Sequence, residues 1–135
     1  GQGAYMNAKR LRVSGRRSLD VAMIATGMPF KGRATGPNYL EELNLVMAEV
    51  AGVRRFGSAA LDLAYVAAGR FDAFWETHLK PWDIAAGLIL VSEAGGFVSE
   101  VGGWLSHPAI LAREYDVAMI VGTNGIDRIA DAVAT

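Results

Sequence analysis

The chain of 135 residues contains no cysteine. This absence excludes disulfide bonds, thiolate metal ligands and a cysteine nucleophile, and it is compatible with a reducing compartment. No stretch reaches the roughly 18 consecutive apolar residues of a membrane span. The N-terminus also lacks the basic and then apolar pattern of a signal peptide. We therefore expect a cytoplasmic protein with no membrane partner.

The sequence also has no excess of charge of one sign, because its 13 basic and 14 acidic residues leave a net charge of -1. No broad electrostatic field attracts nucleic acid or an anionic membrane, so direct nucleic-acid binding is not expected. Apolar residues are plentiful instead, at 52% of the chain, which is enough to build the core of one domain of this length.

The sequence also lacks an initiator methionine. The sequence begins with "GQGAYMNAKRLRVS" and opens directly on two strand-like runs, residues 4–6 and 10–13, around the turn-former Asn7. Such a start is typical of the middle of a protein, although a processed terminus or a cloning scar would look the same.

Strands and helices are predicted to alternate along the rest of the chain. Apolar runs indicate strands, and apolar residues at helical spacing indicate helices. After Asn38 as N-cap, for example, Leu40, Leu43 and Met47 recur at that spacing. The pattern predicts strands over 19–27, 53–57, 71–76 and 117–124, a strand followed by a tight turn over 97–105, and helices over 39–51, 58–69, 84–94 and 127–134. The fold class is therefore α/β, a single domain over residues 1–135 with a sheet covered by helices on both faces.

Asp83 is the first candidate site residue, in "KPWDIAAGLILVSEAGG" at 80–96. It stands at the start of an otherwise apolar helix, where an aspartate accepts hydrogen bonds from free backbone N–H groups. Capping is therefore the simplest interpretation. A metal-binding or catalytic role is the alternative, but one carboxylate alone makes no Mg²⁺ site, since this ion takes several oxygen ligands.

Other candidates lie near strand ends and helix starts. Glu76 ends a predicted strand seven residues before Asp83, so the two carboxylates could meet at one sheet edge, or Glu76 could be an exposed surface residue. Gly57, Ser58 and Ala59 open a helix whose N–H groups can approach a polar ligand, or they form only a turn and cap. Asp62 is expected to pair with an arginine: Arg54, Arg55 or Arg70.

Together, "GSAALDLAYVAAGRFDAFWE" and "KPWDIAAGLILVSEAGG" resemble the C-terminal half of the inositol monophosphatase family, the Mg²⁺-dependent, lithium-sensitive phosphatases. The long Trp-Asp-x-Ala-Ala-Gly…Glu-Ala-Gly-Gly signature is specific, and the likeness extends over most of the chain. The resemblance implies that the intact protein is an inositol-phosphate phosphatase with this family's layered α/β fold. A homodimer of the intact protein is expected.

The resemblance also implies roles for single residues. Asp83 looks like a ligand of a catalytic magnesium, close to the hydroxyls of the substrate, and this role replaces the capping interpretation. Glu76, Gly57, Ser58 and Ala59 match positions that line the inositol pocket. Glu93, Gly95 and Gly96 belong to the signature but look structural, closing the end of the helix.

One departure from the family pattern matters most. The family's other metal ligands come from a Glu and from an Asp-Pro-x-Asp-Gly-Thr motif in the N-terminal half, and no Asp-Pro occurs here. We therefore expect a C-terminal fragment that lacks the metal-binding half and is inactive alone. Rival interpretations are a fructose-bisphosphate or nucleotide-phosphate phosphatase, and a non-catalytic protein-binding module in transcription or RNA maturation.

Overall fold

The structure, a computed structural model, describes residues 1–28, 30, 39–76, 79–101 and 118–122. Eleven elements lie within these ranges, and all but one of them are α-helices or β-strands. In chain order they are β1 (Tyr5–Met6), β2 (Lys9–Arg10), the 3-10 helix η1 (Leu19–Val21), β3 (Met23–Thr26), α1 (Tyr39–Glu49), β4 (Gly52–Arg54), α2 (Ala59–Ala67), β5 (Ala73–Glu76), α3 (Pro81–Glu93), β6 (Phe97–Val101) and β7 (Ala118–Gly122).

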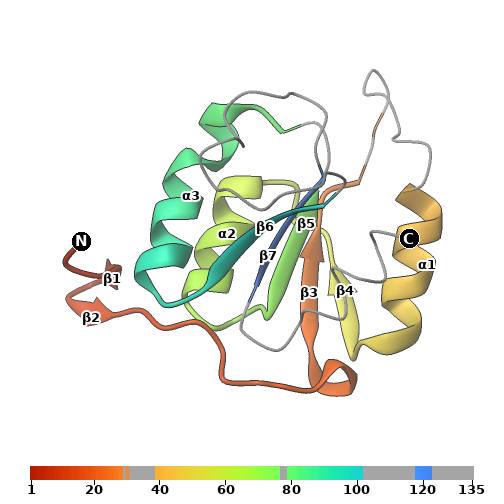
Figure 1. Ribbon diagram of the computed structural model, residues 1–135, viewed down its shortest axis with the longest axis horizontal. Coiled ribbons are helices and arrows are strands. Elements are labelled where there is room, and N and C mark those ends of the chain that lie inside the picture. The colour runs from red at the N-terminus through yellow and green to blue at the C-terminus, as the bar shows by residue number, and fades with distance from the viewer. Residues whose placement is uncertain (29, 31–38, 77–78, 102–117, 123–135) are drawn as a thin grey trace.

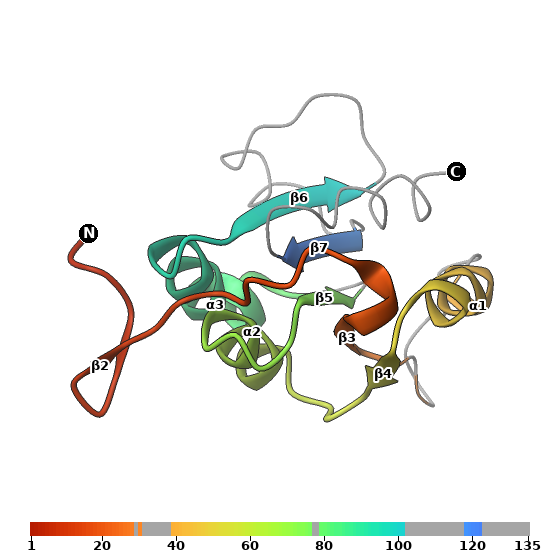
Figure 2. The same ribbon diagram turned by 90° about the horizontal axis from the view of Figure 1, so that it is seen from below.

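Five of the strands form one sheet in the order β4-β3-β5-β7-β6 (Figure 1). The strands β4, β3 and β5 are parallel, whereas β7 runs antiparallel to both of its neighbours. Figure 2 shows α1 on one side of this sheet and α2 with α3 on the other. The predicted α/β class, with helices on both faces of the sheet, is therefore confirmed.

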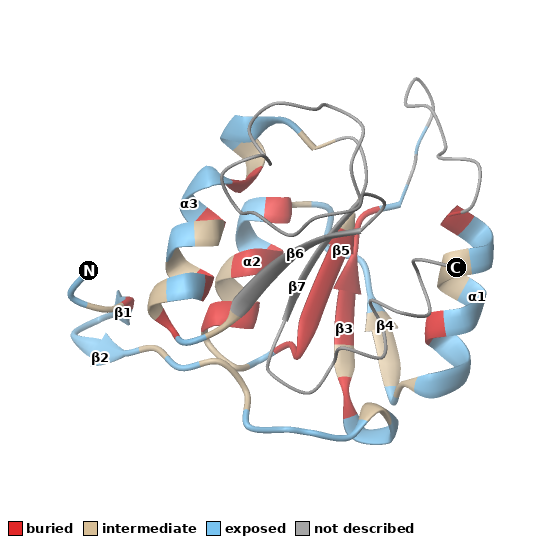
Figure 3. Cartoon of the chain, viewed as in Figure 1, coloured by how far each residue is buried: buried red, intermediate tan, exposed pale blue. Residues whose placement is uncertain are grey.

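The two faces of the sheet carry separate apolar cores, because successive side chains of a strand point to opposite sides. In β5, Ala73 and Trp75 pack toward α1, whereas Phe74 packs toward α2 and α3. In β3, Ile24 and Ala25 divide in the same way. Figure 3 shows the buried residues gathered in β3, in β5 and on the inner sides of the helices. The alternation predicted for residues 71–76 is thus confirmed from Ala73 onward, whereas Phe71 lies before the strand and packs in the same core as Phe74.

Several predicted boundaries are wrong. Residues 19–21 form η1 rather than the start of a strand, and β4 ends at Arg54 instead of continuing to Gly57. The helix α3 begins at Pro81, three residues before the predicted start, because proline suits the first turn of a helix, where its missing N–H is no loss. The predicted helix over 127–134 and the proposed N-cap Asn38 lie outside the described residues.

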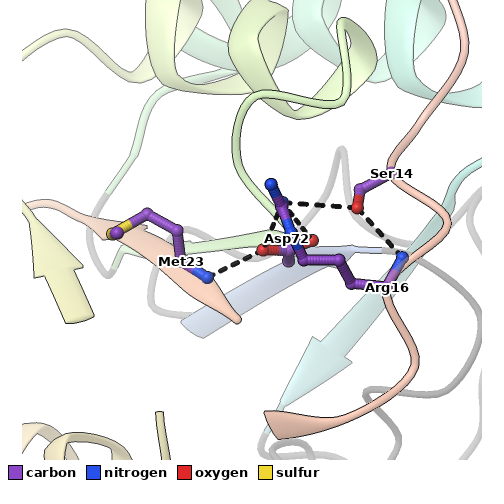
Figure 4. Close-up of polar contacts among 4 residues, drawn as sticks. All are labelled: Ser14, Arg16, Met23 and Asp72. Carbon is purple, nitrogen blue, oxygen red and sulfur yellow. Dashed lines mark hydrogen bonds and ion pairs between the residues drawn. The ribbon is translucent and has the colours of Figure 1, made fainter. Parts of the chain in front are cut away.

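A buried carboxylate fastens the N-terminal segment to the sheet (Figure 4). Asp72, which is fully buried just before β5, accepts hydrogen bonds from Nη1 of Arg16 at 3.0 Å to each of its oxygens. Its Oδ2 also accepts the backbone N–H of Met23 at 2.7 Å. Because these bonds join the N-terminal segment, β3 and β5, Asp72 stabilises the sheet at the amino end of its parallel strands.

The Glu-Ala-Gly-Gly end of the signature is structural, as predicted. Gly95 has a φ of 88°, and its N–H donates to Ser92 while the N–H of Gly96 donates to Val91. This is the Schellman arrangement, which satisfies the last carbonyl groups of α3. Glu93 accepts the N–H of Gly3 at 2.7 Å, and this bond ties the β1–β2 hairpin to the helix end.

The outer side of α3 is apolar and exposed. Trp82 is 77% exposed and Ile89 is 66% exposed, and the exposed Ala85 and Ala86 lie between them at helical spacing. We call these four residues the α3 stripe. Among the described residues, none of the helices has the length and apolar character needed to cross a membrane.

Candidate functional site

The topology places the candidate residues at one edge of the sheet. Three parallel strands, β4, β3 and β5, end at this edge, which is the upper one in Figure 1. The helix α2 follows β4 and the helix α3 follows β5, so both helices begin there. Ligands of open α/β sheets bind at the carboxyl ends of the strands, and this edge is therefore the candidate site.

Glu76 is the last residue of β5 and lies across the end of β3. A Cβ atom placed on Gly27, the residue after β3, would lie 1.9 Å from Cδ and 2.2 Å from Oε2 of Glu76. The carboxylate thus occupies the space that a side chain at position 27 would need. Glu76 is half-buried at this edge. The interpretation of Glu76 as a merely exposed surface residue is wrong.

A buried polar cluster supports the end of β5 from the α1 side. The ring of Tyr39 stacks on Trp75 with centroids 6.3 Å apart, and its hydroxyl lies 3.3 Å from the hydroxyl of Thr26. Burial raises the pKa of Tyr39, the bond with Thr26 opposes this rise, and the charge of Glu76 adds to it. The influence of Glu76 on Tyr39 shows that the cluster adjoins the candidate site.

Glu42 and Trp75 hold the two unpaired polar atoms of this cluster. Oε2 of Glu42 and Nε1 of Trp75 are both buried without a hydrogen-bond partner. Burial raises the pKa of Glu42, and the nearby indole N–H lowers it by proximity rather than through a well-formed hydrogen bond.

Asp83 lies in the first turn of α3 and is half-buried. Its Oδ2 accepts the backbone N–H of Lys80, the residue before the helix, at 3.0 Å. Asp83 therefore does close the helix end, but it is not the N-cap that the sequence predicted. It is the third residue of the helix, and its side chain bonds back to the N-cap residue Lys80. One such bond does not use up a carboxylate, which has two oxygens and about four acceptor sites.

The start of α2 combines a glycine turn with small residues. Gly57 has a φ of 87°, a left-handed conformation that favours glycine. Ser58 stands at the N-cap position, yet its hydroxyl makes no capping hydrogen bond, and Ala59 is buried in the first turn. The turn role of Gly57 is confirmed, whereas Ser58 keeps its hydroxyl available at the candidate edge.

Asp62 corrects one prediction, because none of the arginines that the structure describes, including Arg54, Arg55 and Arg70, forms an ion pair with it. The side chain is fully buried, and neither carboxylate oxygen has a hydrogen-bond partner. Burial raises its pKa to about 6, and the charge of Arg55 only partly opposes the rise. Arg70 instead lies over the ring of Tyr65, 5.2 Å from its centroid.

The described residues do not form a complete magnesium site. Mg²⁺ prefers near-octahedral oxygen coordination, and within the described ranges no three acidic or histidine side chains gather closely enough to hold a metal ion. Asp83 offers carboxylate oxygen of the right kind, but only one such group. The described part of the chain therefore does not by itself fit a bound magnesium.

Gly27 contacts the side chain of the candidate residue Glu76, and the sequence did not point to this contact. Its signal was a glycine directly after a buried apolar strand, which indicates a turn or the close approach of another group. The signal alone does not say which group approaches, because Glu76 lies 49 positions further along the chain.

Comparison with known proteins gives one consistent result. Residues 1–131 match the inositol monophosphatase family. An inositol-1-monophosphatase of Mesorhizobium japonicum is 65% identical over 103 residues, which are 76% of this chain and 39% of the relative. The Nus factor SuhB of Escherichia coli is 46% identical over 136 residues, covering 98% of this chain and 51% of that protein.

Solved structures agree with this result. The crystal structure of the extragenic suppressor protein suhB from Bartonella henselae is 48% identical, with a TM-score of 0.84 over 100% of this chain and 51% of that one. The chain thus spans about two fifths to one half of the length of these relatives. The match over nearly every residue, with the fold and the signature, shows that this chain belongs to the inositol monophosphatase family.

Proposed function

We propose that this chain is the part of a magnesium-dependent phosphoric monoester hydrolase that receives the alcohol side of its substrate. The substrate class is inositol 1-phosphate or a related polyol phosphate, and the products are the free alcohol and phosphate. The observation that supports the proposal is the topology, which puts the end of β5 with Glu76, the first turn of α3 with Asp83 and the start of α2 at the edge where three parallel strands end. A relative named inositol-1-monophosphatase, at 65% identity, supports this substrate class.

The chemistry of the site suits a polyol. Ionised carboxylates accept hydrogen bonds only, and hydroxyl groups donate them, so Glu76 is proposed to bind substrate hydroxyls. The small residues Gly57, Ser58 and Ala59 let a ligand approach the backbone N–H groups at the start of α2 closely. The names of the relatives do not favour a fructose-bisphosphate or nucleotide-phosphate phosphatase.

The role proposed for Asp83 is that of a magnesium ligand and catalytic residue near these hydroxyls. Since a single carboxylate does not hold the ion, we propose that the other ligands come from the remainder of a longer protein, in keeping with the greater length of the relatives.

Asp83→Asn in the intact protein tests this role. The variant should fold normally, because an asparagine oxygen can also accept the N–H of Lys80. Loss of a residue that only supports a metal ligand lowers activity by about 10–100-fold. The activity of Asp83→Asn should fall by more than this, because the variant loses an anionic ligand of the metal. Phosphate release from inositol 1-phosphate over a magnesium titration measures the loss, with thermal unfolding as the control. Unimpaired turnover at low magnesium would leave Asp83 a helix-closing residue only.

The isolated 135-residue chain should behave differently. We expect no turnover of inositol 1-phosphate above background, and no shift of its melting temperature on addition of millimolar Mg²⁺, since ligand stabilisation requires a site that binds at that concentration. Turnover that Asp83→Asn abolishes would refute the expectation that this chain is inactive alone.

A further inference from the structure

The contact with Glu76 gives Gly27 a function, although the backbone conformation at position 27 does not require a glycine. The φ angle of Gly27 lies outside the left-handed region, so its conformation is open to other residues. Space is what forbids a side chain there, because an added Cβ would lie within 2.3 Å of three atoms of the Glu76 carboxylate group. The absence of a side chain at position 27 therefore determines where this carboxylate can lie.

The backbone around the contact is firmly held on both strands. In the parallel register Thr26 pairs with Trp75, and the N–H of Gly27 donates to the carbonyl of Trp75 at 3.3 Å. Trp75 is 1% exposed. With the two strand ends fixed in this way, the part of Glu76 that remains adjustable is its side chain, and Gly27 provides the surface on which it lies.

We propose that Gly27 is a positioning residue for Glu76 and thereby helps to determine which substrate hydroxyls the site accepts. This inference rests on the proposed function, in which Glu76 binds the alcohol part of a polyol phosphate. A methyl group at position 27 displaces the carboxylate from the end of β3, the position from which it is proposed to bind substrate hydroxyls. The far end of a flexible glutamate moves at little expense in stability, so the displacement acts on substrate binding rather than on folding.

The test compares Gly27→Ala with Gly15→Ala in the intact protein. Gly15 is the matched control, because an added Cβ there meets nothing within 4 Å and its φ is also outside the left-handed region. Gly27→Ala should raise KM for inositol 1-phosphate by about three- to tenfold, the loss of roughly one hydrogen bond, with little change in kcat. Gly15→Ala should change neither parameter, and both variants should melt as the parent does.

A double-mutant cycle with Glu76→Ala identifies the cause. Once the carboxylate has been removed, Gly27→Ala should have no further effect on KM, because the group that it displaces is gone. An equal effect of Gly27→Ala in both backgrounds would mean that the methyl group meets the substrate itself, and would overturn the positioning role.

The remaining outcomes separate this inference from the proposed function. If Glu76→Ala leaves KM unchanged, the substrate-binding role of Glu76 is wrong. If Glu76→Ala raises KM and Gly27→Ala does not, the proposed function stands and the role of Gly27 falls. Loss of folding in Gly27→Ala that Glu76→Ala does not rescue would also overturn that role, whereas rescue would support the contact.

Discussion

At the scale of single residues, two fully buried aspartates have opposite surroundings. Asp72 accepts hydrogen bonds from Arg16 and Met23, whereas both carboxylate oxygens of Asp62 lack a partner. A buried charge without a partner opposes folding, and a buried charge with its partners in place does not. The same substitution at the two positions should therefore change stability in opposite directions.

Asp62→Asn should stabilise the chain above about pH 6. Burial raises the pKa of Asp62 in the folded state to about 6, above its ordinary value of 3.8, so the folded state holds the proton longer than the unfolded state. The free energy of unfolding therefore falls as pH rises through this interval, and it stays lower above it. Since one pKa unit corresponds to about 1.4 kcal/mol, the gain of the variant at pH 7.5 should approach about 2–3 kcal/mol.

Urea unfolding of the parent and of Asp62→Asn at pH 4 and pH 7.5 measures this gain, which should be small at the lower pH. Asp72→Asn is the matched control and should destabilise the chain at pH 7.5, because it removes a charged partner of Arg16. If the parent loses no stability relative to Asp62→Asn between pH 4 and pH 7.5, then Asp62 is not charged and unpaired in the folded state at the higher pH.

At the scale of elements, the ion pair between Arg16 and Asp72 joins segments that are distant in sequence. Arg16 lies in the irregular stretch between β2 and η1, and Asp72 directly precedes β5. Arg16→Met should cost about 1.5–3 kcal/mol of stability, because it leaves a buried carboxylate with only the N–H of Met23. The loss should appear as a lower urea midpoint at an unchanged m-value.

Arg17→Met is the control for this prediction. Arg17 is exposed, and the described part of the chain shows no ion pair to it. Its replacement should change stability by less than about 0.5 kcal/mol, as is usual for surface positions. Equal losses in the two variants would mean that the Arg16 side chain contributes through general charge rather than through its bonds to Asp72.

Local patterns predicted the elements of this fold better than they predicted its contacts. The period of two over residues 71–76 and the glycine pair at 95–96 specify a strand and a helix end through their immediate neighbours. The helix end is confirmed, and the strand is confirmed from Ala73 onward. The start of α3 was wrong because Asp83 resembles an N-cap in sequence, and only the bond from Lys80 shows that it lies inside the first turn.

Contacts across the sheet could not be obtained from the sequence in this way. Gly27 meets Glu76 because β3 and β5, which are far apart in the chain, pair in parallel. Among the described residues, no arginine forms an ion pair with Asp62 of α2, although three arginines lie close to it in sequence. The family signature pointed to Glu76 and Asp83 as site residues, but it did not show which side chain lies against which.

At the scale of the whole molecule, the α3 stripe is the feature that a separate globular domain would not be expected to keep exposed. Trp82, Ala85, Ala86 and Ile89 form an apolar surface on one side of a helix. The solved relatives are about twice as long as this chain. We therefore infer that the remainder of a longer protein covers the stripe, in agreement with the proposed origin of the missing metal ligands.

The isolated chain should accordingly self-associate through the α3 stripe. Exposed apolar surface of this kind drives association, and a charge at its centre opposes it, so Ile89→Lys should shift sedimentation of the chain toward the monomer without unfolding it. Ser18→Lys is the matched control, because it adds the same charge at an exposed position just before η1, outside the α3 stripe, and should leave association unchanged. In the intact protein the effects should reverse: a lysine at position 89 would be buried against the covering half and should lower stability by several-fold more than Ser18→Lys. A parent chain that sediments as a compact monomer at high concentration, together with an intact protein that tolerates Ile89→Lys, would show that the stripe is ordinary surface.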